Sequence, residues 1–239
     1  MRQIKAGKLL LLVLLLLFSF FSTLGARCLL EAGRQNTLTA RTVSSPSYRQ
    51  DFYSPEMRRE QDLLSEECRT FLRQVSEDSV YFPVPASSLD SSLTVSYVDS
   101  WMYERSYREK SRHEGTDIMA VRNERGLYPI VSISDGTITN LGWLELGGWR
   151  IGITSPQGVY YYYAHLDSYA DIAEGDTVKA GQLLGFMGDS GYGPEGTKGE
   201  FDVHLHLGIY SWGTGEEISV NPYYLLRSLE DRRLKYQYS

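Results

Sequence analysis

Glycine is concentrated in one half of this chain, and its distribution restricts the fold more than any other feature of the sequence. Nineteen of the 22 glycines lie between Gly115 and Gly215. Short β-prone stretches alternate with them, namely residues 129–133, 149–154 and 159–164. Glycine-containing turns separate these stretches at hairpin spacing, at Asp135-Gly136, Gly147-Gly148 and Gln157-Gly158. Because short turns join antiparallel strands, the sequence predicts a mainly β fold built on an antiparallel β-sheet.

The first 26 residues are predicted to form an export segment, either a cleaved signal peptide or a retained membrane anchor. Residues 1–8 carry three basic side chains and no acid, and residues 9–26 are uncharged and consist mostly of Leu and Phe. This pattern is typical of a secretory signal, but its length also nearly reaches the roughly 20 apolar residues that span a bilayer. Membrane anchoring through residues 9–26 therefore stays open. Either outcome predicts an extracytoplasmic protein, secreted or membrane-anchored at the cell surface.

Residues 27–85 are predicted to form a stalk with one helix, followed by a β-domain over residues 86–239. Between Glu56 and Val75, apolar residues recur at three- and four-residue spacings, which is the helical pattern. The prolines of residues 81–85 interrupt any helix, because proline lacks an amide hydrogen and disfavours helix in the preceding residue. Cys28 and Cys68 could form one disulfide or remain separate thiols, and the sequence leaves their pairing open.

The charge balance argues against nucleic acid as a partner. Lys and Arg number 24 against 30 for Asp and Glu, which gives a net charge of −6. Without the three basic residues of the export segment, the net charge of residues 27–239 is −9. Proteins that bind through phosphates carry the opposite sign. Positive charge would not drive binding to a cell wall either, and the sequence does not fix an oligomeric state.

The four histidines of the chain all fall in the predicted β-domain, in patterns typical of a metal site. His204-Leu-His206 lies in an apolar strand pattern, and the side-chain period of two places both imidazoles on one face. In His113-Glu-Gly-Thr-Asp117 a histidine precedes a carboxylate by four residues, with an apolar run after it. We expect a loop that turns into a strand here and directs both side chains inward. His165 ends a third strand-like run.

Zinc in a hydrolytic site takes three protein ligands from His, Asp or Glu and leaves a fourth position open. His113, Asp117 and one histidine of the His204-Leu-His206 pair supply such a set, and the pattern does not say which one. The other histidine of the pair and His165 do not bind the metal in this interpretation. One could act as a general acid or base, and the other could stabilise an oxyanion. The helical HExxH signature is absent, because Gly, Thr and Asp follow His113-Glu114.

With these patterns in place, the sequence resembles the lysostaphin-type (LytM-like) zinc endopeptidases of bacterial cell walls. Five stretches carry the resemblance, and it covers about Leu93 to Tyr224. The stretches are Arg112-His-Glu-Gly-Thr-Asp-Ile-Met-Ala120, Pro129-Ile-Val-Ser-Ile-Ser-Asp-Gly136, Tyr162-Tyr-Ala-His-Leu166, Glu174 to Gly191, and Val203-His-Leu-His-Leu-Gly208. The resemblance does not extend to residues 27–90 and implies nothing about their structure or function.

The resemblance implies a zinc metallopeptidase domain with a groove over the metal and an activity against peptidoglycan. His113, Asp117 and His206 match the zinc ligands, while His165 and His204 match the two catalytic histidines that do not bind metal. The implied reaction is hydrolysis of peptide bonds in peptidoglycan cross-bridges or stem peptides. Tyr107 lies where some members place a tyrosine that supports the transition state.

One departure from the family concerns the approach to the His204-Leu-His206 strand. The glycine-rich loop over residues 188–199 is longer than is usual in the family and contains Asp189 and Glu195, with Glu200 just beyond it. We expect this loop to border the groove, where its length and acidity could alter which cross-bridge fits. The resemblance therefore does not determine the substrate preference.

Three other functions compete with hydrolysis. A non-hydrolytic protein of the same fold could bind peptidoglycan or regulate an amidase, but all five functional positions are filled by the expected residue types. A biotinyl- or lipoyl-type carrier is disfavoured because Lys179 lies between Val178 and Ala180 rather than between methionines. In the third alternative, the N-terminal helix is the active part of an exported structural stalk.

Overall fold

The computed structural model describes residues 65–105, 111–212, 215 and 217–239. All of them belong to the second of the two units into which the chain divides, residues 41–239. The predicted export segment, Cys28 and Tyr107 therefore lie outside the described residues. Within the described ranges, every helix is too short or too polar to cross a membrane.

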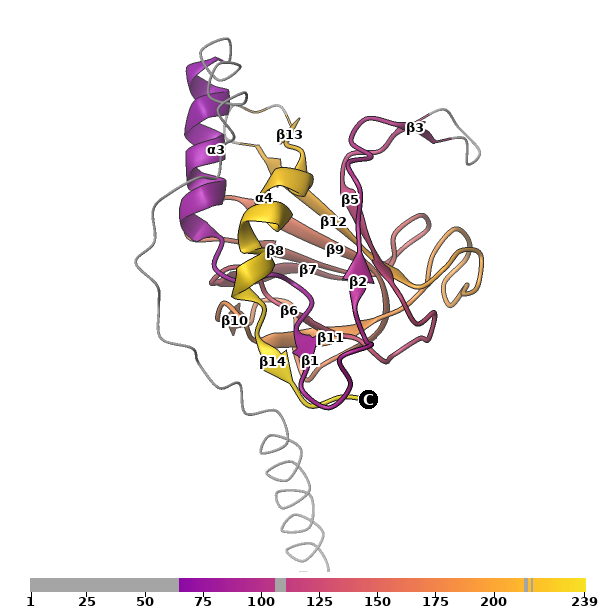
Figure 1. Ribbon diagram of the computed structural model, residues 1–239. Helices are drawn as coiled ribbons and strands as arrows, with labels where there is room; N and C mark the ends of the chain where they lie inside the picture. The colour runs from indigo at the N-terminus through magenta and orange to yellow at the C-terminus, as the bar shows by residue number, and fades with distance from the viewer. Residues whose placement is uncertain (1–64, 106–110, 213–214, 216) are drawn as a thin grey trace, which may run out of the picture. The chain divides into compact units, whose positions relative to one another are not determined.

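The described residues form fourteen short strands, two α-helices and one 3-10 helix (Figure 1). The helices are α3 (Glu66–Asp78), α4 (Pro222–Leu229) and η1 (Glu230–Arg232). The strands are β1 (Ala86–Ser87), β2 (Val95–Ser96), β3 (Glu104–Arg105), β4 (Ser111–Arg112), β5 (Thr116–Ala120), β6 (Pro129–Val131), β7 (Gly136–Leu144), β8 (Gly148–Thr154), β9 (Tyr160–Tyr169), β10 (Thr177–Val178), β11 (Leu183–Met187), β12 (His204–Ser211), β13 (Ile218–Ser219) and β14 (Lys235–Tyr236).

Ten of these strands form one antiparallel sheet, so the predicted mainly β fold is confirmed. The strand order is β10-β7-β8-β9-β12-β5-β2, with β13 added at β12 and with β11 joining β6 to β9. Every ladder of this sheet is antiparallel. The predicted turns at residues 147–148 and 157–158 connect β7 to β8 and β8 to β9 as hairpins. The hairpin predicted at Asp135-Gly136 is wrong, because β6 and β7 do not pair with each other: β6 pairs with β11, and β7 pairs with β8 and β10. A separate pair, β1 and β14, is parallel.

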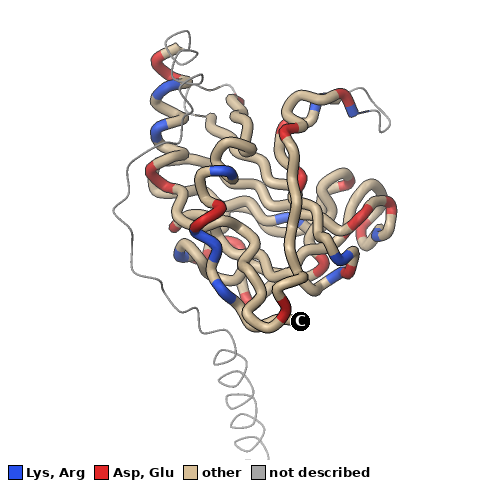
Figure 2. The backbone as a smooth tube through the Cα atoms, viewed as in Figure 1, with Lys and Arg blue, Asp and Glu red and all other residues tan. Residues whose placement is uncertain are grey.

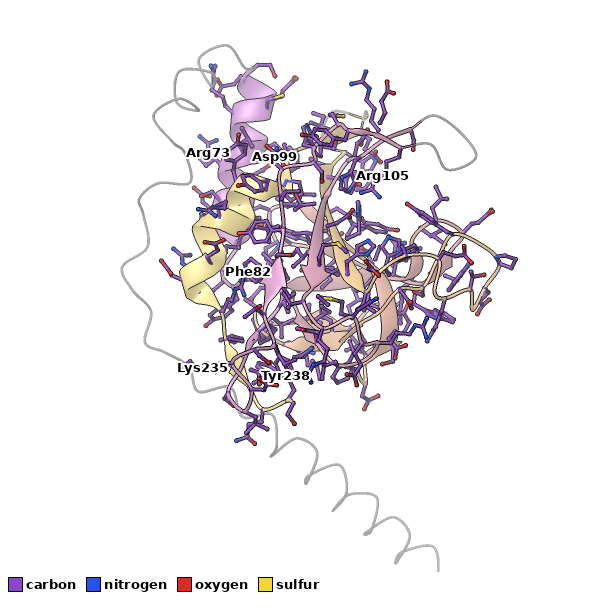
Figure 3. The ribbon with its side chains drawn as sticks, turned by 45° about the vertical axis from the view of Figure 1, so that its right-hand side comes forward. Arg73, Phe82, Asp99, Arg105, Lys235 and Tyr238 are labelled. Carbon is purple, nitrogen blue, oxygen red and sulfur yellow. The ribbon has the colours of Figure 1, made fainter. Side chains whose placement is uncertain are left out.

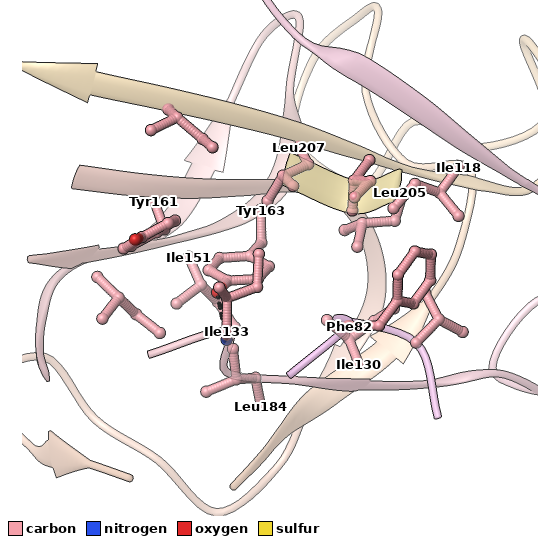
Figure 4. Close-up of a cluster of buried hydrophobic side chains, with 14 of the residues drawn as sticks. Phe82, Ile118, Ile130, Ile133, Ile151, Tyr161, Tyr163, Leu184, Leu205 and Leu207 are labelled. Atoms are coloured by element: carbon pink, nitrogen blue, oxygen red, sulfur yellow. Dashed lines mark hydrogen bonds between the residues drawn. The ribbon is translucent and has the colours of Figure 1, made fainter. Parts of the chain in front are cut away.

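One face of the sheet is covered by a hydrophobic core (Figure 4). Alternation along β9 sends Tyr161 and Tyr163 into this core, where both side chains are fully buried. Their hydroxyls remain paired: that of Tyr163 accepts from the amide of Ile133 at 2.9 Å, and that of Tyr161 is 2.8 Å from the hydroxyl of Ser79. The opposite face of β9 and β12 is thereby left for the polar residues of the site.

The helix expected in the stalk packs against this core. α3 begins at Glu66, because the side chain of Ser65 accepts a hydrogen bond from the amide of Cys68 and caps the helix. Phe71 and Val75 are buried in the same cluster as the sheet residues. Phe82 and Val84 also belong to that cluster. Phe82 is labelled in Figure 3 and lies among the buried side chains of Figure 4. Residues 65–85 therefore share one hydrophobic core with the β-sheet.

Charged residues of both signs alternate over the described backbone (Figure 2). α3 carries Glu66 and Glu67 in its first turn and Arg69 and Arg73 further along. Several of the charges are paired at the surface, among them Arg69 with Glu66 and Lys179 with Asp135. Such exposed pairs contribute little to stability, so the apolar core is the main stabilising feature of the described unit.

Candidate metal centre and groove

The centre of the site is set by the pairing of β5 with β12. In this antiparallel ladder Asp117 lies directly opposite His206. Directly opposed residues are the closest side-chain neighbours in a sheet. Accordingly, Nδ1 of His206 is 2.9 Å from Oδ1 of Asp117. Leu205 and Leu207, on the other face of β12, are fully buried in the core, so the predicted one-sided arrangement of the two histidines is confirmed.

His113 joins this pair from the segment between β4 and β5. Its Nε2 atom lies 3.1 Å from Nδ1 of His206 and 3.2 Å from Oδ1 of Asp117. The imidazole is 3% exposed. Its Nδ1 atom faces Ser100, whose carbonyl oxygen is 3.2 Å away and whose hydroxyl is 2.9 Å away. A proton on Nδ1, donated to this carbonyl, leaves the Nε2 lone pair directed at the cluster.

These three atoms fit a zinc ion. The ligand atoms of a tetrahedral zinc, at bond lengths of roughly 2.0–2.1 Å, lie roughly 3.3 Å apart. Here the three separations run from 2.9 to 3.2 Å. Among the described residues, His113, Asp117 and His206 form the one group of His, Cys, Asp and Glu with this geometry. Two imidazoles and a carboxylate are also a ligand set that zinc hydrolases use.

Gly115 leaves the space that the ring of His206 occupies. A Cβ atom at this position would lie 2.3 Å from Cε1 and 2.5 Å from Nε2 of His206. Real Cβ atoms do not approach ring atoms so closely, so a side chain at residue 115 would displace the imidazole. The glycine inside the His113-Glu-Gly-Thr-Asp117 motif therefore belongs to the architecture of the metal centre.

His204 lies beside the three-residue cluster rather than within it. Its Nδ1 donates a hydrogen bond to the carbonyl oxygen of Asp202 at 2.7 Å, which fixes the proton on that nitrogen. Its Nε2 is 3.8 Å from Oδ1 of Asp117. This Nε2 is buried and has no hydrogen-bond partner within the described part of the chain. A buried lone pair directed at the cluster is suited to accept a proton there.

His165 reaches the site through an irregularity in β9. Strand alternation after Tyr161 and Tyr163 would direct residue 165 into the core. Instead, the ladder between β8 and β9 shifts register between Trp149 and Ile151, and His165 has a left-handed φ of 64°. Such a bulge rotates one side chain to the other face of a sheet. The His165 ring lies 4.7 Å from the ring of His204, and its Nδ1 donates to the carbonyl of Ser190 at 2.7 Å.

Two aromatic side chains cover the pair of histidines. The ring of Phe201 packs edge-on against His165 at 4.6 Å and lies 5.0 Å from His204, while Tyr192 contacts Phe201 at 4.9 Å. Both imidazoles are accordingly buried. Burial lowers the pKa of His204 and is the main cause that lowers the pKa of His165. Both imidazoles are therefore neutral near pH 7.

Arg105 supplies a positive charge to the carboxylate of the cluster. It lies on the β3–β4 hairpin, far from Lys235 and Tyr238 in Figure 3. Its guanidinium forms an ion pair with Oδ2 of Asp117, the oxygen that faces away from the two histidines. Burial would raise the pKa of Asp117, but its close contacts with the imidazoles of His113 and His206 outweigh burial and hold the pKa well below its ordinary value. Asp117 is thus an anion, as a metal ligand must be.

A groove of three adjoining cavities passes over the metal centre. A cavity of about 600 Å³ includes Arg105, His113 and Asp117 in its lining. A second, of about 250 Å³, includes His165 and His206. The third, of about 320 Å³, shares Glu114, Tyr162 and Tyr210 with the second. An extended peptide could therefore lie across the cluster and continue in both directions.

Several residues of the site carry no motif in the sequence. Ser100 and Ser190 act through backbone carbonyls that orient histidines, and any residue type supplies a carbonyl. Phe201 lies three residues before His204, and Arg105 lies in β3, eight residues before His113, but neither residue type at that spacing is a recognised metal or catalytic motif. The acidic character of the loop over residues 188–199 is reduced, because Asp189 is buried and paired with Arg125.

Fold and site together define an antiparallel-sheet protein with a candidate zinc centre of hydrolase type. The sequence profile of Peptidase family M23 matches residues 111–222. A crystal structure of a candidate glycyl-glycine endopeptidase, lytM, from Ruminococcus gnavus shares 56% identity and a TM-score of 0.67, over 78% of this chain and 76% of that one. The chain belongs to peptidase family M23, which confirms the resemblance to lysostaphin-type peptidases.

Two curated relatives carry named activities. The L-Ala–D-Glu endopeptidase of Bacillus subtilis (strain 168) is 41% identical over 157 residues, which make up 65% of this chain and 45% of that protein. The glycyl-glycine endopeptidase ALE-1 of Staphylococcus capitis is 42% identical over 66 residues, 27% of this chain and 18% of that protein. The chain thus spans less than half the length of the curated relatives it matches.

Proposed function

We propose that this chain is a zinc metallopeptidase that hydrolyses peptide bonds in peptidoglycan cross-bridges or stem peptides. The observation that carries the proposal is the spacing of the His113, Asp117 and His206 ligand atoms, beside a buried Nε2 of His204 that has no hydrogen-bond partner among the described residues. Membership of family M23 and the named endopeptidase activities of two relatives support it. The same activities support an extracytoplasmic location, secreted or membrane-anchored, with residues 1–26 as signal or anchor.

In this proposal the zinc is held by Nε2 of His113, Oδ1 of Asp117 and Nδ1 of His206. Zinc at such a site polarises a carbonyl and makes water more acidic. The ion pair of Arg105 with Asp117 keeps the carboxylate fixed and ionised. The hydrogen bond between His113 and Ser100 fixes the ring orientation, as a partner beyond the ligand shell does in other zinc sites.

His204 and His165 are assigned to proton transfer. Each has its Nδ1 proton bound to a backbone carbonyl, so each has an acceptor lone pair at Nε2. One of the two can take a proton from the attacking water and return it to the leaving nitrogen of the peptide. For the other to donate to the oxygen of the scissile carbonyl, its Nε2 would first have to take a proton from solvent in the groove, because its Nδ1 proton is already bound. Phe201 packs against both rings and holds them in place.

The test measures metal and product on the same preparation. Zinc content of the purified 239-residue chain is determined, and release of new amino termini from purified peptidoglycan is followed before chelation, after chelation and after zinc is restored. We expect about one zinc per chain and release that stops and recovers with the metal. Zinc without release would favour the alternative, a non-hydrolytic protein that binds peptidoglycan or regulates an amidase. Absence of zinc would overturn the ligand assignment.

A further inference from the structure

The third cavity of the groove is an aromatic pocket on the same face of the sheet as the metal centre. We define it by Tyr160, Tyr162, Tyr210, Trp212, Asn140, Glu114 and Glu217, which line about 320 Å³. It adjoins the metal centre directly: the rings of Tyr162 and His206 are 6.0 Å apart, and Glu114 follows His113 in the chain. A peptide residue that flanks the bond at the metal would place its side chain here.

The tyrosines of this pocket are held in place. The hydroxyl of Tyr160 donates to Oδ1 of Asn140 at 2.9 Å, and that of Tyr210 donates to the carbonyl oxygen of Glu114 at 2.9 Å. Glycine makes room for one ring, because a Cβ atom at Gly152 would lie 2.0 Å from the hydroxyl oxygen of Tyr160. With their hydroxyls bound, the rings offer mainly their faces and edges to a ligand.

The rings surround a space suited to a cation. Trp212 lies 5.1 Å from Tyr160 in an edge-on arrangement and stacks at 6.2 Å on Tyr210. The electron-rich faces of indole and phenol attract cations within about 6 Å of the ring centre. Trp212 is 48% exposed and lines the pocket, so part of the side chain is accessible to a ligand.

The charges of the lining agree with this preference. Glu114 and Glu217 are the charged residues of the lining, and both are acidic. Burial raises the pKa of Tyr210, and the charges of Glu114 and Glu217 raise it further, so this phenol stays neutral. Burial raises the pKa of Tyr160 and Tyr162, and the charge of Arg150, which does not line the pocket, only partly opposes this rise.

We propose that the aromatic pocket binds the ammonium group of a basic side chain in the peptide substrate, which makes it a specificity site of the peptidase. The ammonium would lie over the indole of Trp212, with Glu217 as counter-ion and the alkyl stem against the tyrosine rings. This proposal rests on the proposed function, since it names the substrate class for that same groove.

The test compares binding of two synthetic peptides that differ only in charge. The first is N-acetyl-L-Ala-D-Glu-L-Lys amide, and the second carries an acetyl group on the lysine Nε. Binding to the 239-residue chain with His204→Ala is measured by calorimetry. In this variant the His113, Asp117 and His206 set is intact. We expect acetylation to weaken binding about tenfold, the size of a desolvated cation–π contact with a counter-ion.

Two pocket variants and a matched control locate the effect. Glu217→Gln and Trp212→Leu, each made in the His204→Ala chain, should bring the ratio of the two dissociation constants close to one. Glu67→Gln removes an exposed carboxylate on α3, outside the pocket lining, and should leave the ratio unchanged. Because the readout is binding, it separates this proposal from hydrolysis, which is measured on the unsubstituted chain.

Three results would overturn the proposal. The first is that the His204→Ala chain binds the two peptides equally well or binds neither. The second is a ratio that survives both pocket substitutions, which would place the recognition of the amine elsewhere. The third is binding of peptide-free glycan strands that Trp212→Leu abolishes, since aromatic rings also stack on sugars and the pocket would then be a sugar site.

Discussion

Nε2 of His204 lies 3.8 Å from Oδ1 of Asp117, buried and without a hydrogen-bond partner among the described residues. His206, two residues along the same strand, approaches that oxygen to 2.9 Å. Among the described residues, His206 and not His204 belongs with His113 and Asp117 to the group whose ligand atoms lie close enough to share a metal. The two histidines of one motif therefore have different expected roles.

His204→Ala should retain zinc and lose turnover. Removal of a group that transfers protons typically lowers kcat by about 10²–10⁴-fold. Asp117→Ala should instead lose the metal, because it removes a charged ligand at the centre of the cluster. Metal analysis and initial rates on peptidoglycan check both variants. If His204→Ala emptied the metal site, the division of roles between His204 and His206 would be wrong.

Gly115→Ala should weaken zinc binding although residue 115 is not a ligand. The added methyl group would lie 2.3 Å from Cε1 of His206 and push the imidazole out of line. Disturbing the surroundings of a metal ligand typically costs about 10–100-fold in metal affinity. Competition with a zinc-binding dye measures the change.

A matched glycine variant separates this effect from backbone strain. Gly158, in the turn between β8 and β9, has φ of +85°, and a methyl group added there would meet open space. Gly158→Ala should lower the free energy of unfolding by about 1–2 kcal/mol and leave zinc affinity unchanged. Equal zinc affinities for the two alanine variants would contradict the packing argument for Gly115.

Phe201→Ala should reduce kcat while zinc content stays constant. The ring packs against both His165 and His204, so its loss frees two imidazoles that must hold their geometry and admits water between them. A misplacement of about 1 Å can cost 10²-fold in rate. Steady-state kinetics separate kcat from KM. Leu89→Ala, at a residue that is 63% exposed, serves as the control, and an equal rate for both variants would exclude a positioning role for Phe201.

Phe71→Ala should destabilise the whole described unit. Phe71 on α3 is 3% exposed and belongs to the core shared with the sheet. Truncation of a buried phenylalanine costs about 3–5 kcal/mol, whereas Arg73→Ala on the exposed side of the same helix should change stability by less than about 0.5 kcal/mol. Denaturant unfolding of the 239-residue chain measures both. A value for Phe71→Ala as small as that for Arg73→Ala would indicate that α3 is not part of the cooperative unit.

Short-range sequence patterns predicted the structure correctly where a single strand or a single turn determines how the side chains are placed. The position of His204 and His206 on one face follows from the period of two, and the hairpin turns at residues 147–148 and 157–158 follow from glycine. The same alternation failed at His165, because a bulge in β9 reverses the face at that residue. A bulge depends on how three strands fit together, and no pattern within Tyr162-Tyr-Ala-His-Leu166 predicts it.

The sequence by itself determined the kinds of chemical group available and their local order: four histidines and an aspartate in an antiparallel β-domain. Only the tertiary structure decided that His206 rather than His204 faces Asp117 and His113, residues about ninety positions away. It also decided that α3 packs on the sheet and that Tyr160, Tyr210 and Trp212 meet in one pocket. The reason is physical: strand register and packing between distant segments are fixed by burial of the whole core, which no local spacing encodes.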